Sequence, residues 1–143
     1  MLSLISPAKI NLFLHIIGQR SDGYHNLETI FQLLDFGDTL SFSERADKLI
    51  TLTSNYNDIS RNENLIIKAA ELLRRETGII KGCNIHVNKV IPMGAGLGGG
   101  SSNSATTLLV LNSLWNCGLS PDKLAHLGQT LGADIPVFVK GNT

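Results

Sequence analysis

The chain has 143 residues, enough for one domain with a single hydrophobic core, and its apolar content of 43% is ordinary for a globular protein. Twelve Lys and Arg residues balance twelve Asp and Glu residues, so the net charge is zero and a basic nucleic-acid-binding surface is not expected. No apolar run approaches the roughly 20 residues that a membrane-spanning helix needs, so neither a nucleic acid nor a membrane is an expected partner.

The first part of the chain is dominated by stretches that predict β-strands. They cover residues 2–6, 8–18, 27–36, 39–43 and 49–53. Alternation of apolar and polar residues, the period of a half-buried strand, supports several of these assignments. Two segments are expected to be turns: residues 19–26, around Asp22-Gly23, and the pair Gly37-Asp38.

Helical spacing first replaces strand alternation near residue 65. Apolar residues there predict a helix that Gly78 ends. Its N-cap is either Ser60, in a capping box with Glu63, or one of the asparagines Asn62 and Asn64. Residues 83–91 alternate again and predict a strand.

The last part of the chain is predicted to be mainly helical. One helix is expected over residues 101–115, and another is expected from Pro121 to about residue 131, with Ser120 as its N-cap. An apolar stretch at residues 135–139 follows. Strands that come first and helices that follow one another late indicate an α+β fold rather than strict βαβ alternation.

The most unusual segment is PMGAGLGGGSS, residues 92–102. A dinucleotide fingerprint fits Gly94, Gly96 and Gly99 literally, but the acidic residue expected about 20 positions later is missing. A Walker A loop would need Lys where Gly100 stands. The third interpretation is a strand, a glycine-rich loop and a helix N-terminus that bind a phosphate through backbone N–H groups. A turn without a ligand remains the structural alternative.

Two charged residues are candidates for chemistry beside such a phosphate. Lys9 lies in a strand-like segment, and Asp134 lies at what is expected to be the end of a helix, an unfavourable place for a carboxylate. If they meet, Asp134 can accept the proton of an attacking hydroxyl while Lys9 keeps it charged and stabilises the transferred group. A lysine that extends into solvent and a turn-forming aspartate are the alternatives, and the spacing does not decide between them.

Other polar side chains give weaker signals. Tyr24 and His25 follow a predicted turn and suit stacking on a nucleobase and binding its edge, although an exposed loop aromatic is the simpler interpretation. Cys83 and Cys117 match no metal-ligand spacing, and no metal site is predicted. They are expected to be reduced thiols packed as small apolar residues in a cytoplasmic protein.

Several segments carry a family resemblance when they are taken together. They are SPAKINL at residues 6–12, GQR at 18–20, DGYH at 22–25, PMGAGLGGGSSNSA at 92–105 and LGADIP at 131–136. This set closely resembles the GHMP kinase superfamily, and within it the kinases that act on 4-diphosphocytidyl-2-C-methyl-D-erythritol. The glycine-serine segment alone would indicate only the superfamily.

The resemblance implies a fold, a reaction and a set of site residues. The fold would be the superfamily's N-terminal domain, a mixed β-sheet packed with helices, which is also found in RNA-binding ribosomal proteins. The reaction would be ATP-dependent phosphorylation, with Mg²⁺ entering with ATP, of the substrate's 2-hydroxyl in non-mevalonate isoprenoid biosynthesis. Asp134 would be the catalytic base and Lys9 its partner. Asn11, Tyr24 and His25 would bind the substrate.

The resemblance also implies an ATP site. Asn64 and Lys89 would lie near the adenine. The residues matching the ATP-phosphate loop are Pro92, Met93, Gly94, Ala95, Gly96, Leu97, Gly98, Gly99, Gly100, Ser101 and Ser102.

Members of this family are longer and carry a C-terminal domain that closes the active site. Residues 1–143 are therefore expected to be a truncated chain, the N-terminal ATP-binding domain alone, with weak or absent activity and an exposed face prone to self-association. Two alternatives remain: another GHMP small-molecule kinase, or a non-catalytic nucleotide- or RNA-binding module of the same fold.

Overall fold

The computed structural model describes residues 2–19, 25–55, 64–91 and 98–141, and for residues 10–19, 25–32 and 35 it describes the backbone alone. Its elements are, in chain order, β1 (Leu2–Gln19), β2 (His25–Arg45), β3 (Ile50–Ser54), α1 (Leu65–Thr77), β4 (Gly82–Asn88), α2 (Gly99–Leu114), α3 (Pro121–Gln129) and α4 (Ile135–Lys140). The described strands form one mixed sheet in the order β1-β2-β4-β3, in which only β3 and β4 are parallel. The expected α+β fold with a mixed sheet is confirmed.

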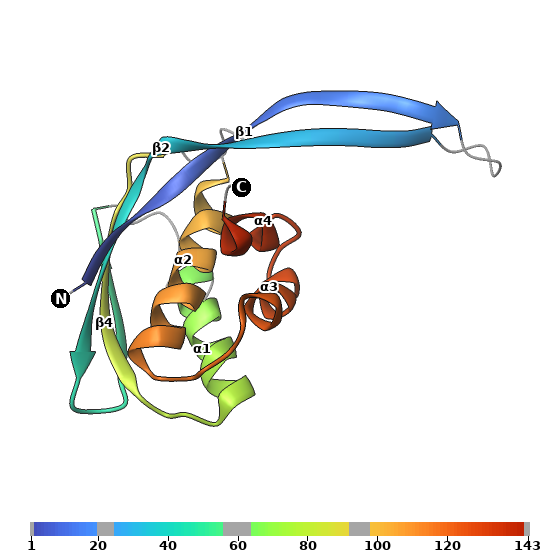
Figure 1. The fold of residues 1–143 in the computed structure, drawn as a ribbon. Helices are drawn as coiled ribbons and strands as arrows, with labels where there is room; N and C mark the ends of the chain where they lie inside the picture. Colours follow the sequence, from blue (N-terminus) through green and yellow to red (C-terminus); the bar gives the residue numbers. More distant parts are fainter. Residues whose placement is uncertain (1, 20–24, 56–63, 92–97, 142–143) are drawn as a thin grey trace.

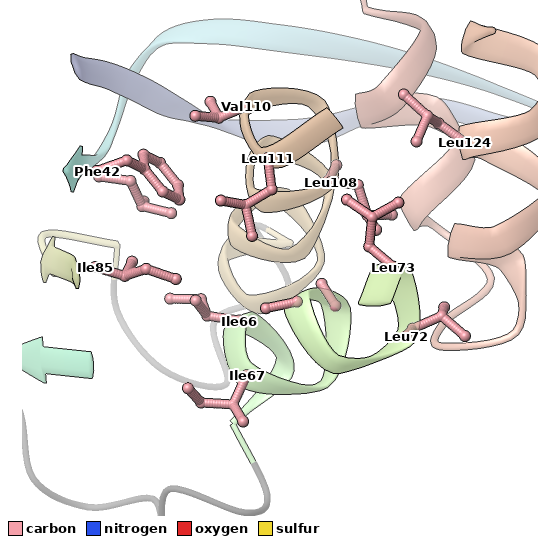
Figure 2. Packing of buried hydrophobic residues seen from close by; sticks show 14 of the residues in the cluster. Phe42, Ile66, Ile67, Leu72, Leu73, Ile85, Leu108, Val110, Leu111 and Leu124 are labelled. Atoms are coloured by element: carbon pink, nitrogen blue, oxygen red, sulfur yellow. The ribbon is translucent and has the colours of Figure 1, made fainter. Parts of the chain in front are cut away.

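The helices lie together on one side of the sheet (Figure 1). The core between the layers contains Phe42 and Ile85 from the sheet, Ile66 and Leu73 from α1, and Leu111 from α2, all nearly or fully buried (Figure 2). The alternation predicted in β4 is confirmed, since its buried residues point to this core and Asn84, His86 and Asn88 do not. Burying these side chains supplies the main stabilising free energy of the domain.

The caps of the helices follow the sequence closely. Asn64, one of the proposed alternatives, caps α1 by accepting a hydrogen bond from Ile66 N at 2.8 Å. Gly78 ends that helix in the left-handed conformation, with φ of +72°. Ser120 caps α3 through Lys123 N, with Pro121 in the first position, as predicted.

Both cysteines are free thiols. Cys83 is fully buried in β4, and Cys117 is partly buried against the core, in agreement with their expected role as small apolar residues. Burial raises the pKa of the Cys83 thiol to about 11, so it stays protonated near neutral pH.

The expected turn at Gly37-Asp38 is wrong, because β2 runs through it. β1 also continues through Pro7, so the two predicted strands at 2–6 and 8–18 are one element. A Cβ on Gly37 would lie 2.0 Å from the carbonyl oxygen of Ser6, and so glycine serves close strand approach here rather than a turn.

A register irregularity follows this close approach. Pro7 pairs with Gly37, but Lys9 pairs with Leu33, so β2 has extra residues opposite Ala8. β4 pairs with β2 only over Thr39–Arg45, and beyond the irregularity β1 and β2 continue as a two-stranded ribbon in the described part of the chain. Figure 1 shows this ribbon extending away from the sheet.

Candidate active site

β1 is attached to the start of α2 by a buried polar cluster. Ser6, fully buried, donates a bifurcated hydrogen bond to Ser102 Oγ at 2.7 Å and Asn103 Oδ1 at 2.9 Å. Because buried hydroxyls and amides need such partners, this contact fixes β1 against the first turn of the helix. Lys9, three residues further along β1, is thereby held close to the same helix end.

The helix α2 begins two residues earlier than predicted, at Gly99, with Gly98 in the N-cap position and φ of +74°. A Cβ on Gly98 would lie 2.9 Å from Phe138 Cζ and 3.0 Å from Lys9 Cγ. Glycine is therefore needed here both for its backbone conformation and for its lack of a side chain. Within the described residues, no side chain caps α2 and no acidic residue lies in its first turn.

This helix end is suited to binding an anion. The first backbone N–H groups of a helix have no partners inside it, and the helix dipole adds positive potential at the same place. A phosphate can approach closely because Gly98, Gly99 and Gly100 carry no side chains. Residues 92–97, the remainder of the predicted phosphate loop before Gly98, lie outside the described residues.

Lys9 and Asp134 meet beside this helix end. Lys9 Nζ lies 3.5 Å from Asp134 Oδ2, and the lysine is buried, whereas 43% of the Asp134 side chain is exposed. The alternative of a solvent-directed Lys9 is thus excluded. A buried ammonium needs a nearby carboxylate to offset its lost hydration, and the exposed side of Asp134 leaves that carboxylate accessible.

Asp134 is placed by the packing between α3 and α4. The expectation that Asp134 ends a helix is wrong, because it directly precedes α4. The next residue, Ile135, is fully buried and packs so closely on Gly128 that a Cβ there would lie 2.5 Å from Ile135 Cγ2. The Asp134 carboxylate therefore lies at the N-terminal end of a helix, which favours negative charge.

Two further predicted residues lie around the start of α2. Lys89 Nζ is 3.5 Å from the position a Cβ would take on Gly99. Asn64 caps α1, and the adjacent Leu65 lies 3.4 Å from the corresponding position on Gly100. Lys89, just after β4, thus has its ammonium beside the start of α2, and Leu65, the residue that follows Asn64, contacts the same helix end, whose first turn contains Ser101 and Ser102.

Two of the three substrate-binding candidates, Asn11 and His25, lie on the ribbon. The backbone of Asn11 pairs with Phe31, and His25 begins β2 opposite Gln19. The side chains of Asn11 and His25 and the whole of Tyr24 lie outside the description. Sequence reasoning missed Ser6, Asn103 and Asp38, which are all buried polar residues of this region. The sequence gives little signal for Asp38, because a Gly-Asp pair such as Gly37-Asp38 is typical of a turn.

No metal site is evident in the ranges that the structure covers, where no three His, Cys, Asp or Glu side chains are grouped to hold an ion. No helix among the same residues is long and apolar enough to cross a membrane.

Comparison with protein families identifies the domain. The profile of the GHMP kinases N terminal domain matches residues 64–142, more than half of the chain. The chain belongs to the GHMP kinase family. The matched region contains α1, β4 and all three later helices, together with Asn64, Lys89 and Asp134.

Curated relatives of this GHMP kinase domain share about half of its residues. A 4-diphosphocytidyl-2-C-methyl-D-erythritol kinase of Hahella chejuensis is 56% identical over 99% of the chain and 51% of its own length. One from Pseudomonas fluorescens SBW25 is 54% identical over 99% of the chain and 50% of its own length. The chain thus spans about half the length of the curated relatives it matches.

Solved structures of GHMP kinases are similar to this chain. A crystal structure of 4-(cytidine 5'-diphospho)-2C-methyl-D-erythritol kinase has a TM-score of 0.81 and 38% identity, covering 98% of this chain and 49% of its own. A mevalonate kinase has a TM-score of 0.71 at 21% identity, covering 94% of this chain and 47% of its own, which shows a shared fold alone.

Proposed function

We propose that residues 1–143 are the ATP-binding half of a kinase that phosphorylates the 2-hydroxyl of 4-diphosphocytidyl-2-C-methyl-D-erythritol, in non-mevalonate isoprenoid precursor biosynthesis. The relatives that share more than half of the residues are named 4-diphosphocytidyl-2-C-methyl-D-erythritol kinase. The observation that carries the proposal is the 3.5 Å contact between Lys9 and Asp134 beside the glycine start of α2. It joins an anion site to an acid–base pair, the two parts that phosphoryl transfer to an alcohol requires.

The residues at the start of α2 fit ATP. A Cβ on Gly98 would lie 2.9 Å from Phe138 Cζ and 3.0 Å from Lys9 Cγ, so glycine is required where the helix begins. The first backbone N–H groups of a helix have no partner inside it and suit a phosphate chain. ATP would supply the phosphoryl group, and Mg²⁺ bound with it would neutralise part of the phosphate charge. The residues proposed to hold the nucleotide are Gly98, Gly99, Gly100, Ser101 and Ser102, with residues 92–97 before them and Asn64 and Lys89 near the adenine.

Asp134 and Lys9 are proposed to act on the attacking hydroxyl. The partly exposed carboxylate of Asp134 takes the proton of the substrate's 2-hydroxyl as that oxygen bonds to the γ-phosphorus of ATP, while the bond from this phosphorus to the bridging oxygen breaks and ADP leaves. Lys9 pairs with Asp134 and, because it also lies against Gly98, brings positive charge to the place where the phosphoryl group is transferred.

Recognition of the alcohol substrate is assigned to the ribbon. Asn11, Tyr24 and His25 are proposed to contact it, with Tyr24 stacking on cytosine and His25 binding the base edge. The backbone of β1 supports this assignment, since it carries Lys9 and Asn11 two residues apart on a continuous strand.

A second domain is proposed to complete the site, because the chain spans half of its relatives' length. Leu2, Leu4 and Ile5 of β1 are 41–60% exposed, so residues 1–143 alone are expected to self-associate and to have weak activity. A cytoplasmic location accords with the use of ATP and with the two free thiols.

The test of the proposal is Asp134→Asn in the complete protein. Loss of the proton acceptor should lower kcat by about 10²–10⁴-fold and leave the dissociation constant for ATP nearly unchanged. Asp122→Asn is the matched control, because Asp122 is also paired with a lysine, Lys140, but lies in the first turn of α3.

Other outcomes identify the alternatives. Wild-type turnover by the Asp134→Asn variant would refute the assigned role. Activity on homoserine, mevalonate or a sugar, but not on the cytidyl substrate, would indicate a different GHMP kinase. Salt-dependent RNA binding without ATP binding would indicate a non-catalytic module.

A further inference from the structure

Asp38 is the most completely surrounded charged residue described in the structure. It is fully buried in β2, opposite Ser6 of β1. Its Oδ1 accepts hydrogen bonds from Val90 N at 2.6 Å and Ile91 N at 2.8 Å, and its Oδ2 pairs with Lys89 Nζ at 2.7 Å. One carboxylate thus binds three consecutive residues, those that connect β4 to the glycine-rich segment.

The backbone of Lys89 is held from the other side by Asn55, directly after β3. Asn55 Oδ1 accepts from Lys89 N at 2.7 Å, and Asn55 Nδ2 donates to Lys89 O at 3.1 Å. Lys89 therefore has its main chain fixed by one residue and its ammonium fixed by another. A long lysine side chain loses most of its rotamer freedom in such an arrangement, so the position of its charge is determined before any ligand binds.

That charge lies where the helix dipole opposes it. Lys89 Nζ is beside Gly99 at the positive end of α2, a place that favours anions and disfavours cations. The Asp38 carboxylate compensates for this cost and for the burial of the ammonium. Lys9 lies against the neighbouring Gly98 and is likewise paired with an aspartate, so two lysines flank the start of the helix.

We propose that Asp38 is a positioning residue for nucleotide binding: it holds the Lys89 ammonium at the start of α2 and fixes the backbone that leads into the glycine-rich segment. This inference rests on the proposed function for the identity of the nucleotide. Asp38 does not touch the ligand. It acts through Lys89 and through the direction of residues 90 and 91.

The two Asp38 oxygens have different partners, the backbone for Oδ1 and Lys89 for Oδ2, so one substitution can remove one contact and keep the other. Asp38→Asn can keep Oδ1, and with it both backbone hydrogen bonds, while the amide NH₂ replaces the oxygen that binds Lys89. In the complete protein we expect this variant to weaken ATP binding about tenfold, measured by calorimetric titration, and to leave the KM for the alcohol substrate unchanged.

A second variant separates positioning from stability. Asp38→Asn alone leaves a buried ammonium without its partner and should lower the Tm. In the double variant Asp38→Asn/Lys89→Met the unpaired charge is gone, so the Tm should recover in part while ATP binding stays as weak as in Lys89→Met alone. A merely structural Asp38 would instead affect ATP binding independently of Lys89, so the double variant would bind ATP more weakly than Lys89→Met alone.

Asp47→Asn is the matched control. Asp47 also pairs with a cation, Arg45, and accepts a backbone hydrogen bond from Leu49 N, but it lies beyond the opposite end of the β2–β4 pairing. The ATP affinity of the Asp47→Asn variant should equal that of the wild type.

Two results would overturn the inference: ATP affinity of Asp38→Asn within twofold of wild type, or effects of Asp38→Asn and Lys89→Met that multiply in the double variant. A wild-type protein that does not bind ATP would refute the proposed function itself.

Discussion

Gly98→Ala tests whether the start of α2 and Lys9 are coupled. An L-residue at φ of +74° costs about 1–2 kcal/mol relative to glycine. The new Cβ would also lie 2.9 Å from Phe138 Cζ and 3.0 Å from Lys9 Cγ, and crowding in a packed interior adds about 1–3 kcal/mol. Phe138 and Lys9 are both buried, so neither can move into solvent without loss.

The same crowding should affect catalysis. The methyl group lies between α2 and the stem of Lys9, whose ammonium is 3.5 Å from Asp134. Displacing that ammonium by about 1 Å is expected to lower kcat by roughly 10²-fold, the loss typical of such misplacement. Tm from thermal denaturation and kcat from an assay coupled to ADP release, both in the complete protein, measure the two effects.

Gly118→Ala provides the comparison, because Gly118 has the same φ of +74° but nothing within 4 Å of its Cβ position. It carries the backbone cost alone, so we expect a Tm decrease of about 3–6 °C, roughly half that of Gly98→Ala, with unchanged kcat. Equal Tm decreases for the two variants, with full activity in Gly98→Ala, would refute the coupling.

Two further predictions concern caps and charge. Asn64→Ala removes the N-cap of α1 and should cost about 1 kcal/mol of stability, as should Ser120→Ala at α3, but only Asn64→Ala should raise the KM for ATP; an equal KM in both variants would remove Asn64 from the nucleotide site. Hydrogen bonding to Arg45 lowers the pKa of Asp47 from 3.8 to about 2, so its contribution to stability is present above pH 3.8 and disappears as the pH falls through about 2. The Tm difference between wild type and Asp47→Asn should therefore shrink as the pH falls below 3.8 and vanish only below about pH 2. A difference that does not shrink over this range would contradict this origin.

Local patterns were sufficient to predict much of this fold. Ser120-Pro121 and Gly78 marked helix boundaries because capping depends on a few neighbouring residues. The alternation in β4 likewise identified its buried face, since side-chain direction in a strand depends only on position.

Features that depend on distant residues were not predictable in this way. Gly37 resembles a turn glycine until β1 is seen to approach it, and Asp38 gains its meaning only when residues 89–91 pass beside it. Lys9 and Asp134 come from opposite ends of the chain, and no local spacing requires them to meet. The family resemblance, rather than the pattern, connected them before the structure did.

The ribbon of β1 and β2 places the two proposed specificities on different parts of the domain. The groups proposed to select the nucleotide lie around the start of α2, whereas Asn11 and His25, proposed to select the alcohol, lie on the two-stranded extension. Under the proposed function, exchanging the ribbon between members of the family is therefore expected to change the choice of alcohol and to leave the choice of phosphate donor unchanged.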